Sequence, residues 1–136
     1  MLRRVVLLCG ALLVGVIVLG GVALAQDIRG TSGHDDLTGT PQMDRIYGLG
    51  APDTIAGLEG NDDCYGGSGA DEIGCGDGSD RIDGGFGEDA LFGGPANDWI
   101  IAADGQRDQV DCGRGENDTT WVDRKDVVDA NCENVF

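Results

Sequence analysis

The sequence predicts an all-β fold, a parallel β-solenoid built from coils of 18 residues. Three observations lead to this prediction. Aspartates recur every nine residues, an apolar residue follows each aspartate by two positions, and glycines precede each aspartate at fixed distances. A repeat this short is typical of a solenoid, in which each unit contacts only its neighbours, and not of a conventional globular core.

The aspartates and the apolar residues each form an unbroken series. The aspartates are Asp35, Asp44, Asp53, Asp62, Asp71, Asp80, Asp89 and Asp98. The apolar residues are Ile28, Leu37, Ile46, Ile55, Cys64, Ile73, Ile82, Leu91 and Ile100. Because side chains alternate between the two faces of a strand, one apolar residue between two outward neighbours predicts a three-residue strand with one buried side chain.

Glycine-rich segments separate these short strands. Glycine tolerates positive φ and leaves backbone carbonyls uncovered, so we expect these segments to be turns and not strands. Two turns and two strands make one coil, and strands 18 residues apart then stack in parallel about 4.8 Å apart. Residues 28–111 would give about four and a half coils and a rod of about 22 Å, with the apolar residues between two thin sheets.

The two ends of the chain depart from the repeat. Arg3 and Arg4 precede a long apolar run that ends in Ala23-Leu24-Ala25, so we expect residues 1–25 to be a cleavable secretory signal peptide. An uncleaved anchor is the alternative, since about 20 apolar residues can cross a bilayer. We expect the solenoid over residues 26–111 and a C-terminal cap over residues 112–136, where the nine-residue period slips. We then expect the mature protein to be secreted, either free or associated with the cell surface, and not in the membrane.

Four cysteines remain after the leader, which favours disulfides in an exported chain. Four cysteines allow three pairings, and proximity in sequence favours Cys64 with Cys75 and Cys112 with Cys132. Metal binding by a cysteine pair is the alternative. The sequence has no C-x-x-C and a single histidine, His34, which disfavours such a site.

The charge of the chain limits its partners. Its net charge is −16, and cleavage of the leader would make it more acidic. Binding to nucleic acids or anionic membranes needs basic patches, so we expect neither. Cations are the natural partners of such a chain.

The segment 66–74, GGSGADEIG, fits the pattern G-G-x-G-x-D-x-U-x, in which U is a large apolar residue. Over about residues 28–111 the chain resembles the hemolysin-type, or repeats-in-toxin (RTX), family of calcium-binding proteins. The resemblance implies a right-handed parallel β-roll. It also implies several Ca²⁺ ions, with the aspartate of each loop as a ligand and an ion shared by a loop and the second loop after it.

The residues themselves also favour calcium. Stacked coils would bring Asp62 close to Asp80, and the turns offer only oxygen ligands, which suit Ca²⁺ better than Mg²⁺. Turn formation is the alternative role for an aspartate, but carboxylates stacked on one another would repel without a cation. We therefore expect folding to depend on calcium. All eight aspartates are candidate ligands, together with the backbone carbonyls of Gly57, Gly60, Gly66, Gly69, Gly76, Gly78, Gly84 and Gly87.

The calcium sites are not expected to be equal. The loop glycines are best kept from residue 57 to 101, so the strongest sites are expected at Asp62, Asp71, Asp80 and Asp89. Thr31, Thr40 and other residues replace loop glycines in the first repeats. We expect Asp35, Asp44 and Asp53 to be weak or vacant sites.

The expected function is that of a secreted calcium-binding module with a structural or interaction role. Tyr47, Tyr65 and Trp99 should point outward on one sheet, where they either stabilise neighbouring strands or bind a partner protein or cell surface. A calcium-dependent adhesin and an ice-binding solenoid are alternatives. A role as accessory fragment of an exported enzyme or toxin is less favoured, and an enzyme is not expected because the sequence contains no G-x-S-x-G or H-E-x-x-H motif.

Overall fold

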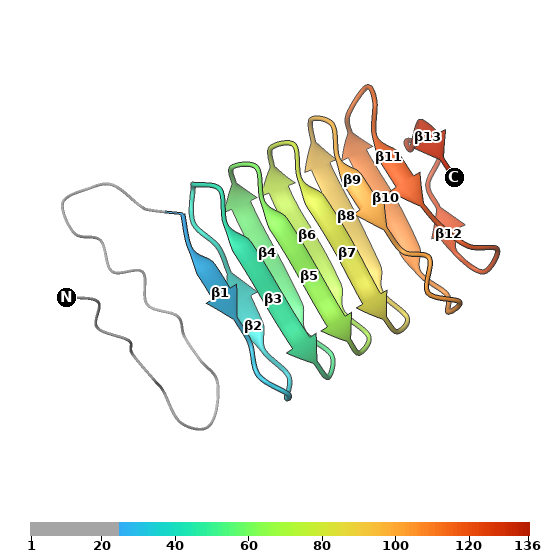
Figure 1. Cartoon of the computed structure of the whole chain (residues 1–136). Helices are drawn as coiled ribbons and strands as arrows, with labels where there is room; N and C mark the ends of the chain where they lie inside the picture. The colour runs from blue at the N-terminus through green and yellow to red at the C-terminus, as the bar shows by residue number, and fades with distance from the viewer. Residues whose placement is uncertain (1–24) are drawn as a thin grey trace, which may run out of the picture.

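A computed structural model describes residues 25–136, which form a flattened coil of short strands (Figure 1). The predicted signal peptide lies outside these residues, apart from Ala25. No helix within residues 25–136 has the length and apolar character needed to cross a membrane. The strands are β1 (Asp27–Arg29), β2 (Asp36–Thr38), β3 (Arg45–Gly50), β4 (Thr54–Glu59), β5 (Asp63–Ser68), β6 (Glu72–Asp77), β7 (Arg81–Phe86), β8 (Ala90–Pro95), β9 (Trp99–Ile101), β10 (Gln109–Arg114), β11 (Thr119–Trp121), β12 (Val127–Val128) and β13 (Asn134–Val135).

The strands alternate between two parallel sheets, as the nine-residue period predicts. The odd-numbered strands form one sheet in the order β1-β3-β5-β7-β9-β11-β13, and the even-numbered strands form the other, from β2 to β12. We call these the odd sheet and the even sheet. From β1 to β9 each residue pairs with the residue 18 positions later, as Ile46 does with Cys64 and Cys64 with Ile82. The 18-residue coil and the two-sheet solenoid are therefore confirmed.

The core is the row of apolar side chains between the sheets. From β1 to β10, each strand buries its second residue, and the exposed fraction of these side chains does not exceed 3%. Cys64 and Cys75 also lie in this core, where a disulfide joins β5 of the odd sheet to β6 of the even sheet. A second disulfide joins Cys112 of β10 to Cys132, between β12 and β13. These are the two pairs that sequence proximity favours.

Seven strands are longer than predicted. They have six residues each, whereas β1, β2, β9 and β11 have the three residues predicted. In β5, for example, Gly67 pairs with Gly85 of β7. For these seven strands the prediction of three residues was wrong because the residue two positions after the buried apolar one, usually a glycine, also points inward. The extended backbone can therefore continue through it and keep its hydrogen bonds to the next coil.

The C-terminal segment continues the two sheets. Within residues 112–136, which the sequence predicts to be a cap, β11 pairs with β9 and β12 pairs with β10. Two strands per coil give about six coils, more than the four and a half predicted. The irregular spacing after Ile101 arises because the extra residues lie in the connections between strands. The stacking of the strands is therefore preserved.

Candidate metal centre

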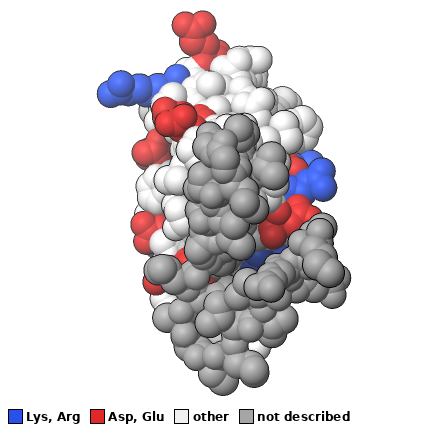
Figure 2. Space-filling view, turned by 90° about the vertical axis from the view of Figure 1, so that its left-hand side faces the viewer, with Lys and Arg blue, Asp and Glu red and all other residues white. Residues whose placement is uncertain are grey.

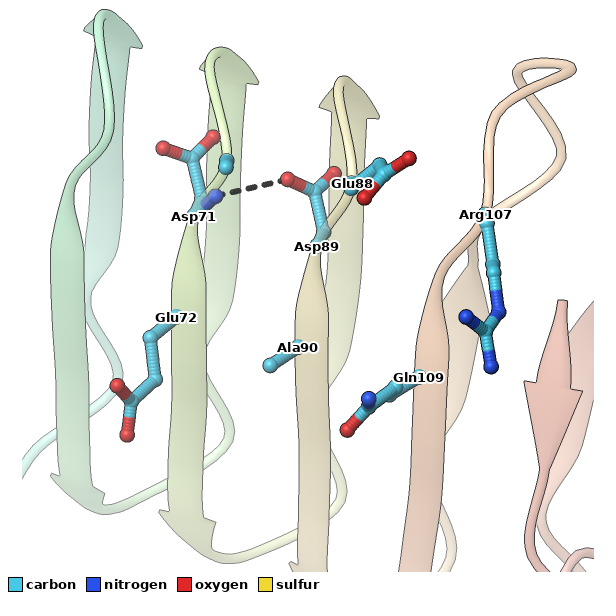
Figure 3. A pocket seen from close by; sticks show the side chains of 8 residues that line it. Asp71, Glu72, Glu88, Asp89, Ala90, Arg107 and Gln109 are labelled. Carbon is cyan, nitrogen blue, oxygen red and sulfur yellow. Dashed lines mark hydrogen bonds between the residues drawn. The ribbon is translucent and has the colours of Figure 1, made fainter.

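Each repeat aspartate directly precedes a strand, and the aspartates of successive coils are linked by hydrogen bonds. The backbone N–H of Asp71, for example, donates to Oδ1 of Asp89 at 2.8 Å (Figure 3). The same bond links every aspartate from Asp35 to Asp80 to the one 18 residues later, at 2.8 to 2.9 Å. The result is two ladders of carboxylates. The odd ladder precedes the odd strands, and the even ladder precedes the even strands.

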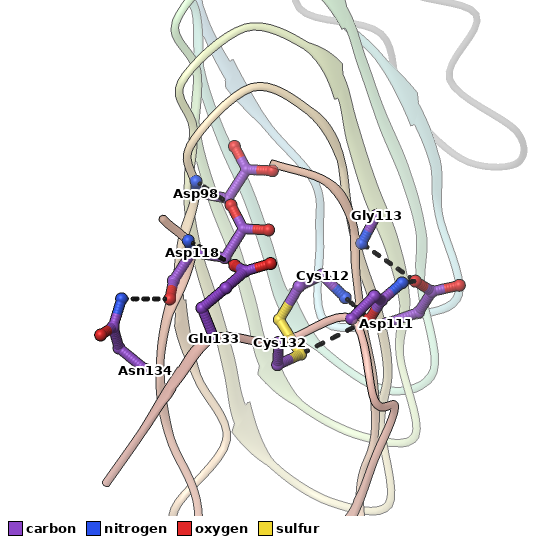
Figure 4. Close-up of a disulfide and its surroundings, with 9 residues drawn as sticks. Asp98, Asp111, Cys112, Gly113, Asp118, Cys132, Glu133 and Asn134 are labelled. Carbon is purple, nitrogen blue, oxygen red and sulfur yellow. Dashed lines mark hydrogen bonds between the residues drawn. A yellow bond between two sulfur atoms is a disulfide. The ribbon is translucent and has the colours of Figure 1, made fainter. Parts of the chain in front are cut away.

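Both ladders continue beyond the regular repeat. Asp89 donates its N–H to Asp108 and Asp98 donates to Asp118, each at 2.8 Å. The even ladder then ends at Asp126, and the odd ladder ends at Glu133, which accepts from the N–H of Asp118 (Figure 4).

Sequence reasoning did not include Asp108 and Asp118 among the ligands. Their partners lie 19 and 20 residues earlier, so a strict nine-residue period misses them. A signal was nevertheless present. Asp108 is followed two residues later by Val110, in the same D-x-U pattern as the regular repeats, and Asp118 is followed two residues later by the buried Thr120.

The second carboxylate oxygen has no hydrogen-bond partner in most of these aspartates. This Oδ2 is buried and unpartnered in Asp53, Asp62, Asp71, Asp80, Asp89, Asp98, Asp108 and Asp118. The exposed fractions of these residues do not exceed 3%. A buried polar atom without a partner is costly, and a buried charge more so, unless a cation or a proton compensates it. A row of such oxygens is therefore a candidate cation site.

The first two aspartates are different because threonines occupy their Oδ2 atoms. Thr40 donates its N–H at 2.5 Å and its hydroxyl at 2.8 Å to Oδ2 of Asp44. Thr31 donates in the same way to Asp35, at 2.6 and 3.0 Å. This arrangement gives a physical reason to expect weak or vacant sites at Asp35 and Asp44. Asp53 does not share it, because its Oδ2 is unpartnered.

The first glycine of each loop leaves space for a ligand beside this oxygen. A Cβ added to Gly66 would lie 2.5 Å from Oδ2 of Asp71 and would also clash with the backbone carbonyl of Gly84. Gly48 has the same surroundings, formed by Asp53 and the carbonyl of Gly66. A carboxylate oxygen and a backbone carbonyl therefore converge beside these two glycines, whereas Cys75 takes the equivalent position before Asp80.

The structure divides the predicted carbonyl donors into two groups. The carbonyls of Gly57, Gly66 and Gly84 face the spaces beside Asp44, Asp53 and Asp71, respectively. The carbonyls of Gly60, Gly69 and Gly76 instead face the equivalent glycines one coil further, Gly78, Gly87 and Gly94. Gly78 and Gly87 thus belong to the outer turns, which stack separately from the inward glycines.

All the potential metal ligands in these spaces are oxygen atoms. Within residues 25–136, no three His, Cys, Asp or Glu side chains cluster as a metal site of their own. A cation would therefore need backbone carbonyls as well as carboxylates. Carboxylate and carbonyl oxygens are the ligand types of Ca²⁺, which accepts flexible geometry, whereas Mg²⁺ requires a tight octahedron.

Burial changes the proton affinity of the ladders. Loss of hydration raises the pKa of Asp89 and Asp98 to about 7 and the pKa of Asp80 and Asp108 to about 6. The N–H donor lowers each value, and neighbouring carboxylates raise it further. Without a cation, Asp89 and Asp98 would be partly protonated at neutral pH, and Asp80 and Asp108 at slightly acidic pH, so protons and a cation compete for the same oxygens.

A surface hollow of about 310 Å³ lies beside the even ladder (Figure 3). It is lined by Asp71 and Asp89 and bordered by Glu72, Glu88 and Arg107. Acidic side chains are also visible on both sides of the described surface seen from the N-terminal end (Figure 2). The surroundings of the ladders are thus mainly anionic, which favours the approach of cations.

The comparison with known families agrees with this geometry. A family model described as "RTX calcium-binding nonapeptide repeat (4 copies)" matches residues 29–48, 38–73 and 76–109. Together these residues make up more than half of the chain. The chain matches no curated protein and no solved structure at a significant level. The matched residues include the ladders from Asp35 to Asp108, and the chain belongs to the RTX family of calcium-binding nonapeptide repeats, the hemolysin-type repeats.

Proposed function

We propose that this protein is an exported β-roll that binds several Ca²⁺ ions along its two carboxylate ladders and needs them to fold. The row of buried, unpartnered Oδ2 atoms carries the proposal. Ca²⁺ bound there would receive a carboxylate oxygen and a backbone carbonyl from adjacent coils, in the spaces that the inward glycines leave. The ion supplies positive charge and coordination, and the chain supplies the fixed oxygens.

The proposed ligands are the aspartates with an unpartnered Oδ2, from Asp53 to Asp118. This set extends the expected sites by Asp108 and Asp118 and leaves out Asp35 and Asp44. The two omitted side chains already have N–H and hydroxyl donors, so a cation would have to displace the hydroxyl group. We propose that these two residues form a calcium-independent first coil.

Folding depends on calcium in this proposal because the ladders bury negative charge. Adjacent aspartates in one ladder repel each other, and burial removes the water that would screen them. A cation that binds only the folded chain shifts the folding equilibrium toward the native state by mass action.

A circular-dichroism titration tests this function. The oxidised protein, in chelator at neutral pH, is titrated with Ca²⁺ and separately with Mg²⁺. We expect a cooperative gain of β signal with Ca²⁺ and little change with Mg²⁺. A full β signal in chelator that Ca²⁺ does not alter would contradict the proposal.

The location and role follow from the same features. RTX repeats together with two disulfides indicate an exported protein, because disulfides persist in oxidising compartments. We propose that the protein is extracellular, where calcium is abundant, and that its role is structural or interactive and not enzymatic.

The surface of the even sheet argues against ice binding. A regular row of outward threonines would favour that function, but Thr38 pairs with Ala56 and Thr54 pairs with Glu72 and Asp36. The two threonines therefore lie in different rows. The odd sheet is a better interaction surface, since its outward side carries Tyr47, Tyr65 and Trp99.

A further inference from the structure

The outward side of the odd sheet, which we call the odd face, carries two parallel rows of side chains. The strand registers place one residue of each row on every odd-numbered strand from β1 to β11. The first row is Asp27, Arg45, Asp63, Arg81, Trp99 and Thr119. The second row is Arg29, Tyr47, Tyr65, Asp83, Ile101 and Trp121.

The composition of the odd face differs from the rest of the molecule. All four Tyr and Trp residues of the chain lie on it. Its three arginines are balanced by three aspartates, so the face is neutral on a chain with a net charge of −16. The equivalent positions of the even sheet carry Asp36, Glu72 and Asp111 and no basic residue. Tyr, Trp and Arg are the residue types that contribute most to protein interfaces.

The aromatic rings are stacked along the roll. The rings of Tyr47 and Tyr65 lie 5.0 Å apart and 6° from parallel, and those of Trp99 and Trp121 lie 4.4 Å apart. The ring faces therefore contact one another, and the ring edges point outward. This is a poor platform for a sugar ring, which stacks on an open aromatic face. Ring edges beside charged groups are better suited to a protein surface.

We propose that the partner of the odd face is a second copy of this chain, packed face to face about a two-fold axis parallel to the strands. Such an axis keeps each row opposite the same row of the second copy and reverses the order of the strands. An axis between β5 and β7 places β5 opposite β7, β3 opposite β9 and β1 opposite β11 of the second copy. The inference deepens the proposed interaction role by naming its partner.

This arrangement brings complementary groups together in both rows. In the first row Asp63, which contacts Arg45 of its own chain at 3.4 Å, faces Arg81 of the second copy, and Arg45 faces Trp99 of the second copy. In the second row Arg29 faces Trp121 of the second copy, Tyr47 faces Ile101, and Tyr65 can donate its hydroxyl to Asp83. Each pair occurs twice by symmetry, and no like charges are opposed.

The alternating charges exclude the neighbouring registers. An axis through β5 would oppose Asp63 to itself and Arg45 to Arg81, and an axis through β7 would oppose Arg81 to itself. An axis between β3 and β5 also pairs opposite charges, but it covers only four strands. An axis between β5 and β7 and an axis between β7 and β9 each cover six strands, about 29 Å of the roll. Of these two, only the axis between β5 and β7 places Asp63 opposite Arg81. An interface of this size is at the lower end for stable dimers, so we expect a dissociation constant in the micromolar range.

Arg81 provides the sharpest test, because within residues 25–136 it forms no ion pair of its own. Sedimentation velocity of the oxidised, calcium-loaded protein from about 1 to about 200 µM spans the expected range. We expect a change from one chain to two as the concentration rises. R81E opposes Glu to Asp63 at two places and should leave one chain at all concentrations. D63R with R81E restores opposite charges across the interface and should restore the dimer.

Q109E is the matched control, since Gln109 is exposed at the equivalent position of the even sheet. It should dimerise like the parent protein. A parent protein that remains a single chain at about 200 µM overturns the dimer, whether or not a protein of another kind binds the face. A dimer that R81E leaves intact also overturns it. Circular dichroism of the same samples reports calcium-dependent folding, so failure of the dimer is distinguished from failure of the calcium function.

Discussion

The backbone N–H of Asp71 donates to Oδ1 of Asp89 at 2.8 Å, and Oδ2 of the same Asp89 side chain is buried without a partner. The hydrogen bond fixes the orientation of the carboxylate but gives a partner to only one of its two oxygens. Each coil therefore prepares the binding oxygen of the next coil, and the number of such oxygens grows with the length of the roll. This relationship predicts that asparagine at the repeat position would bind a cation less well than aspartate.

Asp80 lies in the middle of the odd ladder, and D80N tests the need for charge there. Asparagine keeps an oxygen that can accept from the N–H of Asp62, but it removes the negative charge. We expect calcium affinity to fall at least tenfold, about the loss seen when groups that support a metal ligand are removed. Isothermal titration calorimetry measures it. The exposed Asp36 provides the control, and D36N should bind calcium like the parent protein. If D80N bound calcium with the same affinity as the parent protein, Asp80 would not be a ligand.

The ladders predict an unusual pH dependence of the calcium-free protein. The pKa values of Asp89 and Asp98 rise from the ordinary value of 3.8 to about 7, so the folded chain binds more protons than the unfolded chain between these values. In the absence of calcium, the stability that these two groups contribute is therefore fully present below pH 3.8. It is lost as the pH rises through about 7.

Circular dichroism in chelator checks this dependence. We expect more β signal and a higher unfolding temperature at about pH 5 than at about pH 8. Calcium affinity should change in the opposite direction, because protons compete for the same oxygens. A calcium-free protein that becomes less stable between pH 8 and pH 5 would show that the buried carboxylates are not the controlling groups.

Thr40 is predicted to stabilise the first coil without calcium. T40V keeps the shape of the side chain but removes the hydroxyl that donates to Oδ2 of Asp44. We expect the free energy of unfolding to fall by about 2 kcal/mol, the usual value for a hydrogen bond to a charged group. Denaturant unfolding in saturating calcium measures this change. The exposed Thr31 is the comparison, and T31V should cost less; no loss of stability in T40V would mean that the hydroxyl is not needed.

Gly66 is predicted to be essential for the space in which the ion binds. In G66A the new Cβ would lie 2.5 Å from Oδ2 of Asp71 and 3.0 Å from Cδ1 of Ile73, so both the site and the core must shift. We expect a loss of about 1 to 3 kcal/mol in stability together with weaker calcium binding. G33A is the matched control, since the nearest atom to its Cβ is 3.7 Å away. If G66A and G33A behaved alike in thermal unfolding and calcium titration, the inward glycines would not define the sites.

The sequence was sufficient to predict the solenoid because every coil repeats the same physical demands. A buried residue such as Ile73 and an aspartate such as Asp71 recur at one spacing, and this spacing determines which strands pair. The strand lengths could not be predicted in the same way. Gly66 is compatible with both a turn and a strand, and only the contact with the next coil determines that it lies in a strand.

The ends of the ladders were harder to predict for a related reason. Asp108 and Asp118 keep their places in the stack although the connections before them contain extra residues. Sequence separation therefore changes while the register of the strands does not. The role of Thr40 was also not evident, because a residue that replaces a glycine suggests a weaker turn and does not reveal a hydrogen bond to Asp44.

A crystal structure of the protein grown in calcium, with the ions located by their anomalous scattering, tests the central claim most directly. We expect ions beside the Oδ2 atoms of the aspartates from Asp53 to Asp118, each also in contact with a backbone carbonyl of an adjacent coil, and none beside Asp35 or Asp44. Ladders without calcium in such crystals, or ions bound only to exposed carboxylates such as Asp36, would contradict the account.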